Sequence, residues 1–298
     1  MTSSRRLVVA FAPSPFEAAW RDRITAVAQE AGWRVHGDVG DEANAAFQHS
    51  QEDVLLLVRM GRDVPPPGHE ASIVVITAEP RLVMGHLVEE NAGERAEQSA
   101  CRMGSAALNA VEELSARGGV VLDGSSGRLE VPLIGAVERE QAFADPSGSA
   151  ALDVYGKAGS STGEPTPWDL SLFQYPVGPP GHELDSGRPL IDLTGRGRIL
   201  VHGPYIVLPV GTWAVDLEVI IDPEGGTAHL RFEWGVDLEV EAADPAVDRR
   251  GRYRIRLVRE WTEPGEAQVR IWTQFPHFQG RLELLSCAVE RADQGVTA

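Results

Sequence analysis

The sequence predicts a two-domain protein of mixed class, α/β plus all-β. An open, mostly parallel α/β sheet domain is followed by an antiparallel, jelly-roll-like β-sandwich. Three observations support this: the first half alternates buried-strand and helical patterns, the helical period disappears after Trp168, and the stretch between is rich in Gly, Ser and Pro. The length of 298 residues fits two domains at ~100–200 residues each. We place the domains at residues 1–143 and 168–298, with a linker at 144–167.

The clearest local signal is a strand, cap and helix near the start of the chain. Leu7–Ala12 is a continuous apolar run, as expected of a strand buried on both faces of a parallel sheet. Ser14-Pro15-Phe16-Glu17 has the form of a capping box with proline at the first helical position, and Gly32 supplies a C-terminal stop. We therefore expect Ser14 to cap a helix that ends near Gly32.

Other elements of the first half follow the same alternation. A connection that contains three consecutive prolines, Pro65–Pro67, cannot be a crossover helix, so the sheet departs from a simple doubly wound topology. Further strands are expected at Trp33–His36, Val54–Val58, Ile73–Thr77 and Val120–Leu122, with helices at Asp41–Gln48 and Ala96–Leu114.

The second half consists of short alternating runs separated by turn residues, which is typical of a sandwich or jelly roll. Asp222–Gly226 is a clear hairpin turn between two long strands. The expected strands are Leu190–Leu193, Arg198–His202, Tyr205–Leu208, Thr212–Ile221, Ala228–Trp234, Val236–Ala242, Arg252–Glu260, Ala267–Thr273 and Arg281–Glu290.

Two of these runs nearly repeat each other, WAVDLEV at Trp213–Val219 and WGVDLEV at Trp234–Val240. Each places Val, Leu and Val on one face and two carboxylates on the other. The four carboxylates could form a site for a hard cation. Alternatively they pair with the arginines that alternate along Arg252–Glu260, in which case Val236–Ala242 and Arg252–Glu260 form an antiparallel hairpin.

The segment His202–Trp213 contains Gly-Pro-Tyr, then Leu-Pro, then Gly-x-Trp at the start of a long strand. In this it resembles a carbohydrate-binding-like β-sandwich module that accompanies bacterial glycosyltransferases and other surface-polysaccharide biosynthesis proteins. The resemblance covers about Leu190–Glu290 and implies a polysaccharide-related context without implying a reaction.

Aromatic residues are concentrated in the second half. Sugar rings stack on exposed aromatic faces through their C–H surfaces, although most tryptophans of small sandwiches belong to the core. Trp261 ends a strand beside the turn Thr262–Gly265, and Trp272 alternates with polar residues. We expect a carbohydrate-binding site to use Trp261, Trp272, His277 and Tyr205.

Charge and composition exclude several classes of function. With 27 Lys plus Arg against 44 Asp plus Glu, the formal charge of -17 disfavours binding to nucleic acids and to anionic membrane surfaces, and no apolar stretch has the length of a membrane span. The two cysteines and eight histidines have no metal-like spacing, and no nucleotide-binding glycine motif is present. The apolar run Leu7–Ala12 is too short for a signal peptide. We expect a cytoplasmic protein without a metal, cofactor or membrane insertion.

Two functions remain. The first is a non-catalytic accessory or carbohydrate-binding protein of cell-surface polysaccharide production, with a glycan or a biosynthetic protein as its partner. The alternative is a glycosyltransferase-like enzyme that holds an activated sugar donor between its domains. The absence of a phosphate-binding loop favours the first, and we assign no catalytic residue.

Overall fold

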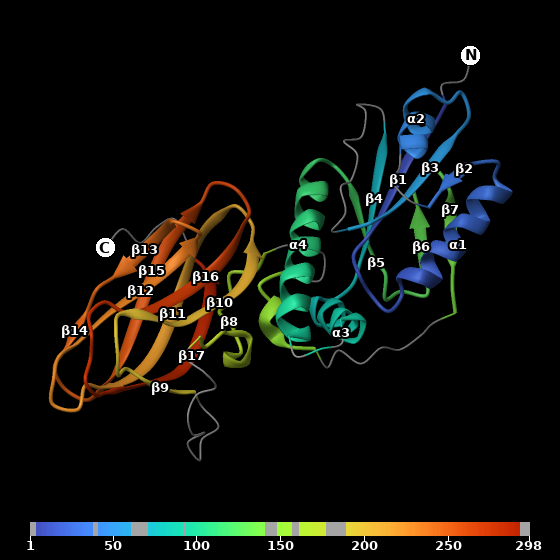
Figure 1. Cartoon of the computed structure of the whole chain (residues 1–298). Helices are drawn as coiled ribbons and strands as arrows, with labels where there is room; N and C mark the ends of the chain where they lie inside the picture. Colours follow the sequence, from blue (N-terminus) through green and yellow to red (C-terminus); the bar gives the residue numbers. More distant parts are fainter. Residues whose placement is uncertain are drawn as a thin grey trace. The chain divides into compact units, whose positions relative to one another are not determined.

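The computed structural model of the chain describes residues 4–37, 41–60, 71–91, 93, 95–140, 148–156, 161–176 and 189–292. The chain forms two compact units (Figure 1). The first contains Met1–Ala96, Ala106–Gly148 and Tyr155–Ser160, and the second contains Glu97–Ser105, Ser149–Val154 and Ser161–Ala298. The predicted fold class is confirmed, because the first unit is built on a parallel sheet and the second on antiparallel sheets. The proposed boundary at 144–167 stays a prediction.

A five-stranded sheet in the order β2-β3-β1-β4-β5 forms the centre of the first unit, and all its pairings are parallel. The central strands are almost fully buried because their residues are apolar on both faces. The strands are β1 (Arg6–Phe11), β2 (Arg34–His36), β3 (Val54–Arg59), β4 (Ser72–Thr77) and β5 (Val120–Asp123), each close to its expected range.

Helix α1 (Glu17–Glu30) follows β1 and ends as predicted, with Gly32 in the left-handed conformation at φ +83°. The predicted cap at Ser14 is wrong. The N-cap residue is Phe16, which has no side-chain cap, and Ser14 instead accepts the Glu17 N–H through its backbone carbonyl at 3.1 Å. Pro15 therefore lies in a tight turn before the helix instead of at its first helical position.

The other helices are α2 (Asp41–His49) and α3 (Pro80–Glu90) in the first unit, and α4 (Ala96–Ala116), whose residues Glu97–Ser105 belong to the second unit. Helix α3 was not expected from the sequence, and neither was the hairpin of β6 (Arg128–Val131) and β7 (Gly135–Glu138). Most of the proline-rich connection, residues 61–70, lies outside the described residues.

The second unit is a β-sandwich. Its first sheet has the order β10-β16-β12-β13 with β14 beside β12, and its second has the order β15-β11-β17-β8 with β9 beside β17. The strands are β8 (Thr166–Pro167), β9 (Leu190–Asp192), β10 (Arg198–Leu208), β11 (Gly211–Asp222), β12 (Ala228–Val236), β13 (Glu239–Ala243), β14 (Ala246–Val247), β15 (Gly251–Trp261), β16 (Gly265–Thr273) and β17 (Arg281–Arg291).

Successive long strands alternate between the two sheets, as in a jelly roll: β10, β12 and β16 belong to the first sheet, and β11, β15 and β17 to the second. Four tryptophans fill one part of the core. The rings of Trp168 and Trp234 are 5.7 Å apart, those of Trp234 and Trp261 are 5.1 Å apart, and the Trp234 indole donates to the carbonyl of Trp213 at 3.3 Å. Most tryptophans of the second half of the chain therefore belong to the hydrophobic core.

The predicted hairpin between Val236–Ala242 and Arg252–Glu260 is wrong. Strand β13 pairs with β12, whereas β15 pairs with β11 in the other sheet. The chain reverses at Asp237 and Leu238, so Leu238 is 93% exposed instead of buried in the core. The repeated pattern had suggested a strand where the structure has a turn.

Candidate functional site

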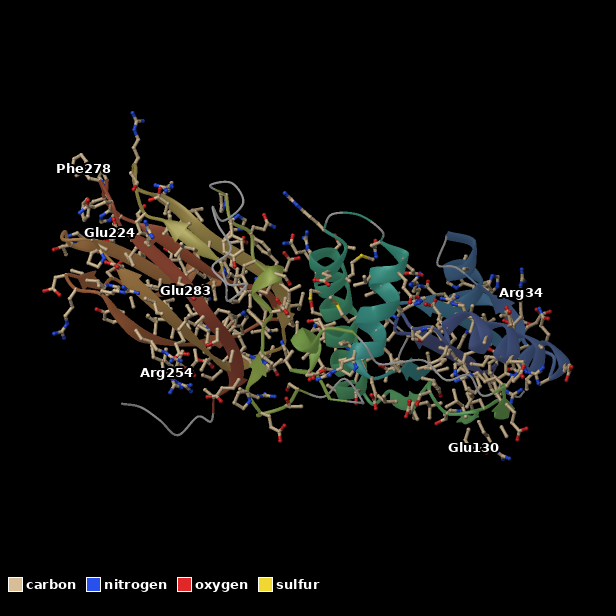
Figure 2. All side chains as sticks on the ribbon, turned by 90° about the horizontal axis from the view of Figure 1, so that it is seen from below. Arg34, Glu130, Glu224, Arg254, Phe278 and Glu283 are labelled. Atoms are coloured by element: carbon tan, nitrogen blue, oxygen red, sulfur yellow. The ribbon has the colours of Figure 1, made fainter. Side chains whose placement is uncertain are left out.

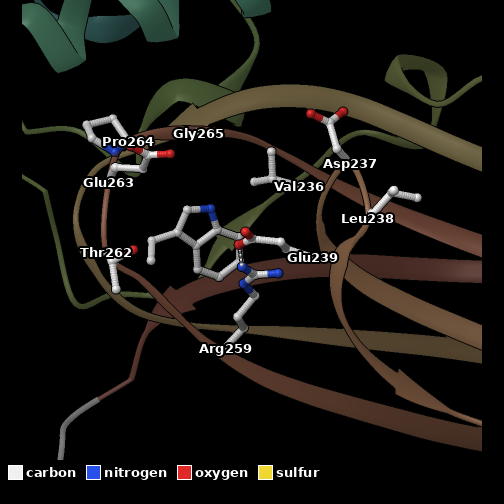
Figure 3. A pocket seen from close by; sticks show the side chains of 10 residues that line it. Val236, Asp237, Leu238, Glu239, Arg259, Thr262, Glu263, Pro264 and Gly265 are labelled. Carbon is white, nitrogen blue, oxygen red and sulfur yellow. Dashed lines mark hydrogen bonds and ion pairs between the residues drawn. The ribbon is translucent and has the colours of Figure 1, made fainter.

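A pocket of about 330 Å³ lies at one end of the sandwich, between two hairpin turns (Figure 3). One wall is the β12–β13 turn, and the other is the β15–β16 turn. The end of β15 contributes the residues between them. The lining residues are Val236, Asp237, Leu238, Glu239, Arg259, Trp261, Thr262, Glu263, Pro264 and Gly265.

Trp261 joins this pocket to the tryptophan core. It is 3% exposed, and its indole Nε1 is buried without a hydrogen-bond partner among the described residues. A Cβ added to Gly265 would lie 3.5 Å from that nitrogen and 2.9 Å from Cγ2 of Val236. Because position 265 has no side chain, the N–H edge of the buried indole lies beside the backbone of Gly265, which itself lines the pocket.

The β12–β13 turn is held in place by backbone geometry and by one arginine. Asp237 has a φ of +47°, a conformation that Asp and Asn tolerate better than most residues. Nη2 of Arg270 donates to the carbonyl of Asp237 at 2.6 Å. The backbone of Asp237 is consequently held at the mouth of the pocket, with its carboxylate exposed.

The pocket contains more acidic than basic groups. Arg259 forms an ion pair with Glu239, with 2.6 Å between Nη2 and Oε2, and its guanidinium lies 5.4 Å from the Trp261 ring (Figure 3). Asp237 and Glu263 are exposed carboxylates, one on each turn. No ion pair is recorded for either of them within the described part of the chain. The site thus offers oxygen acceptors, one buried indole donor and an apolar edge.

Tyr205 lies near the pocket on the outer face of the first sheet. Its hydroxyl is 2.6 Å from Nδ1 of His202. Burial is the main cause that raises the pKa of Tyr205; Arg270 opposes it, and the carboxylates of Glu266 and Asp237 add to it. Strand pairing places the tyrosine near the β12–β13 turn, because Gln268 of β16 pairs with Pro204 on one side and with Gly235 on the other.

Trp272 is on the same outer face but farther along β16. It is partly buried, and its indole donates to Oε2 of Glu233 at 3.0 Å. Glu233 also accepts from Arg231 at 2.7 Å and lies 2.8 Å from Nε of Arg270. Along β16, Trp272 is seven residues from Gly265 of the pocket, which at ~3.3 Å per residue is about 23 Å. Trp272 therefore lies outside the pocket.

His277 is not part of this arrangement. It follows the far end of β16 and forms a backbone bridge with Gly195. The structure therefore places Trp261 in the pocket, Tyr205 beside it, Trp272 along the same sheet and His277 at the other end of the strand. Sequence reasoning missed Arg259 and Glu263 and considered Asp237 only for a cation site, although the turn signal Thr262–Gly265 marked one wall of the pocket.

The repeated carboxylates do not form a cation site. Asp216 pairs with Arg254, Oδ1 to Nε 2.8 Å, and with Arg256, and Glu218 pairs with Arg252. These pairs lie on the outer face of the second sheet, where Figure 2 shows Arg254 at the surface. Among the described residues no group of three or more His, Cys, Asp or Glu could hold a metal ion.

Two other reactive-residue patterns have structural explanations. Residues 159–163 match Gly-x-Ser-x-Gly, but a nucleophile elbow connects a strand to a helix. Here the Ser161 hydroxyl accepts from Arg291, and the N–H of Thr162 bonds to Val154 before the chain enters β8. Cys101 and Cys287 are buried, and burial raises the pKa of both thiols, of Cys101 to about 12, so neither is a reactive thiolate.

The chain matches no protein-family model and no curated protein. Ninety chains of solved structures match, several of them carbohydrate-binding modules. The apo form of the module BiXyn10A CBM1 matches with 10% identity and a TM-score of 0.24, over 30% of this chain and 58% of that one. TmCBM61 in complex with β-1,4-galactotriose has 9% identity and a TM-score of 0.27, over 43% and 88%.

A viral protein that is not described as a carbohydrate-binding module also matches in structure. The infectious bursal disease virus VP2 subviral particle has 11% identity and a TM-score of 0.30, over 46% of this chain and 35% of that one. Likenesses this weak assign no ligand to the present chain. No described helix has both the length and the apolar character that a membrane crossing requires.

Proposed function

We propose that this protein is a carbohydrate-binding protein whose β-sandwich holds a glycan in the pocket between the β12–β13 and β15–β16 turns. One observation carries the proposal: the buried indole N–H of Trp261 has no described partner and faces a glycine in a pocket rimmed by carboxylates. A buried donor without a partner costs ~1–3 kcal/mol, which a ligand hydroxyl at this position would recover.

The chemistry of the lining fits a sugar. Asp237 and Glu263 can accept hydrogen bonds from ring hydroxyls, and Arg259 carries additional N–H donors beside its pair with Glu239. Val236, Leu238 and Pro264 supply apolar surface for the C–H groups of a sugar. Because Trp261 is 3% exposed, the contact uses its edge and its N–H instead of a wide stacking face.

The proposal extends to the biological context. The His202–Trp213 segment, which resembles modules of surface-polysaccharide biosynthesis proteins, supports a non-catalytic accessory role in that process. We also propose the cytoplasmic location expected from the sequence, which contains only two cysteines and no disulfide-type spacing.

Calorimetric titration of the full chain with a panel of oligosaccharides and nucleotide sugars tests the binding function. We expect an oligosaccharide to bind and the double variant Thr262→Ala, Glu263→Ala to lose at least tenfold in affinity, because both residues are exposed on the pocket wall. Asp248→Ala, an exposed carboxylate that does not line the pocket, should bind like the parent chain.

Thermal shift provides the second measurement, because a ligand at one hundred times its Kd stabilises the folded state by ~2.7 kcal/mol. Binding of nucleotide sugars alone, unaffected by the pocket variant, would contradict the proposal and favour the transferase alternative.

A further inference from the structure

We propose that the pocket selects glycans that carry a protonated amino group, that is, amino sugars with a free amine. This inference rests on the proposed function, since it assigns a ligand class to the same pocket. Its basis is the balance of charge in the lining, together with the buried indole donor that already indicates a ligand.

The lining contains three carboxylates, Asp237, Glu239 and Glu263, and one cation, Arg259. Arg259 is committed to Glu239 by the 2.6 Å ion pair, and only 15% of its side chain is exposed. Two carboxylates therefore remain without a recorded cationic partner in the described chain, and both are exposed at the mouth (Figure 3). A cationic ligand group would neutralise part of this charge.

The neighbouring arginines do not reverse this balance. Arg270 contacts Asp237, but its guanidinium is shared between the Asp237 carbonyl and the carboxylate of Glu233. Arg102 pairs with Glu266, with 2.6 Å between Nε and Oε1. The formal charge of -17 on the whole chain adds a field of the same sign. Uronic acids and phosphorylated or sulfated sugars should consequently be repelled.

The shape of the pocket limits how the amine is presented. A volume of about 330 Å³ is at the small end of the range of ~300–1,000 Å³ usual for ligand pockets. Asp237 and Glu263 are on opposite turns, so a sugar seated against the Trp261 edge lies between them. An amine on that ring can reach a carboxylate, while a ring hydroxyl accepts from the indole N–H.

The experiment compares three oligosaccharide probes of equal length against the full chain by calorimetry: a glucosamine oligomer, its fully N-acetylated counterpart and a uronic acid oligomer. At low salt and mildly acidic pH, we expect the free-amine oligomer to bind about tenfold more tightly than the acetylated one. The uronic acid oligomer should bind most weakly. Raising the salt concentration should reduce the preference, because exposed charges are screened over ~10 Å at 0.1 M salt.

The double variant Asp237→Asn, Glu263→Gln keeps the shape of the pocket and removes its excess charge. Asn also tolerates the positive φ of position 237. We expect this variant to bind the free-amine and acetylated oligomers equally well. Asp248→Asn, outside the pocket, is the matched control and should keep the full preference.

The outcomes separate this inference from the binding function. Equal affinity for the free-amine and acetylated oligomers in the parent chain, or a preference for the uronic acid oligomer, would overturn the amino-sugar selectivity and leave glycan binding intact. A preference that persists in the double variant would overturn the assignment to these carboxylates. Failure of all three probes and of the wider panel to bind would contradict the proposed function itself.

Discussion

The segments Trp213–Val219 and Trp234–Val240 differ at one position, Ala214 against Gly235, yet they adopt different structures. The first is a continuous stretch of β11 with Val215, Leu217 and Val219 fully buried. The second leaves β12 after Val236, turns at Asp237 and Leu238 and returns as β13. The same alternation of apolar and acidic residues therefore does not determine whether the apolar residues are buried or whether the strand continues.

The difference at the second position accounts for the turn. A Cβ added to Gly235 would lie 2.1 Å from the carbonyl oxygen of Glu239 and 2.8 Å from Cα of Val240. Only glycine allows β13 to fold back this closely over β12. In the first segment, alanine occupies the equivalent place, and β11 instead pairs along its whole length with β15 and β17. The turn created by Gly235 then forms one wall of the pocket.

The largest difference in stability between the two segments is expected when their central leucines are replaced. Leu217 is completely buried, whereas Leu238 is 93% exposed. Leu217→Ala should lower the free energy of unfolding by about 2–5 kcal/mol through the cavity that it leaves. Leu238→Ala should change it by less than about 0.5 kcal/mol. Denaturant titration of both variants measures this, and equal losses would show that the second segment is packed like the first.

The second prediction exchanges the residue types at the one position where the two segments differ, Ala214 and Gly235. Gly235→Ala should destabilise by about 2–3 kcal/mol, because the new methyl group meets backbone atoms that cannot move without breaking the hairpin. Ala214→Gly, the reverse exchange in β11, should cost about 1 kcal/mol through the loss of a buried methyl and added chain freedom. Glycan affinity should fall only in Gly235→Ala. If this variant were as stable as the parent, Gly235 would not be the cause of the turn.

Much of the fold could be predicted from sequence because apolar periodicity reports burial directly. The five parallel strands and helix α4 lie near their expected positions for this reason. Periodicity does not report which strand pairs with which, so Val236–Ala242 was assigned to the wrong partner. Capping at Ser14 failed because the backbone turn at Pro15 competed with the side-chain cap.

The candidate site was only partly predictable. Trp261 could be chosen because it ends a strand beside a turn signature, Thr262–Gly265. Asp237 could not, because the repeat suggested that it faces outward from a strand. The lining comes from two turns distant in sequence, and their meeting depends on sheet pairing that composition does not encode.

The smallest difference in stability is expected for Asp216 and Asp237, the fourth residues of the two repeated segments. Burial alone would raise the pKa of Asp216, but the hydrogen bond from Arg254 and the charge of Arg256 outweigh it and hold this pKa below its ordinary value. A carboxylate with a lowered folded-state pKa stabilises the protein above the pKa of the unfolded chain, ~3.9, and this contribution is lost as the pH falls through the folded-state value.

Asp216→Asn should therefore cost about 1 kcal/mol at pH 7, and the difference from the parent should shrink as the pH falls below about 4. Asp237→Asn should leave stability unchanged at either pH, since the side chain is exposed and Asn accepts the same φ. Urea titrations of the parent and both variants at several pH values make the comparison. A loss in Asp216→Asn that is independent of pH would mean that packing, instead of the arginine pairs, gives this residue its role. Such a loss would also remove the electrostatic distinction between the two segments.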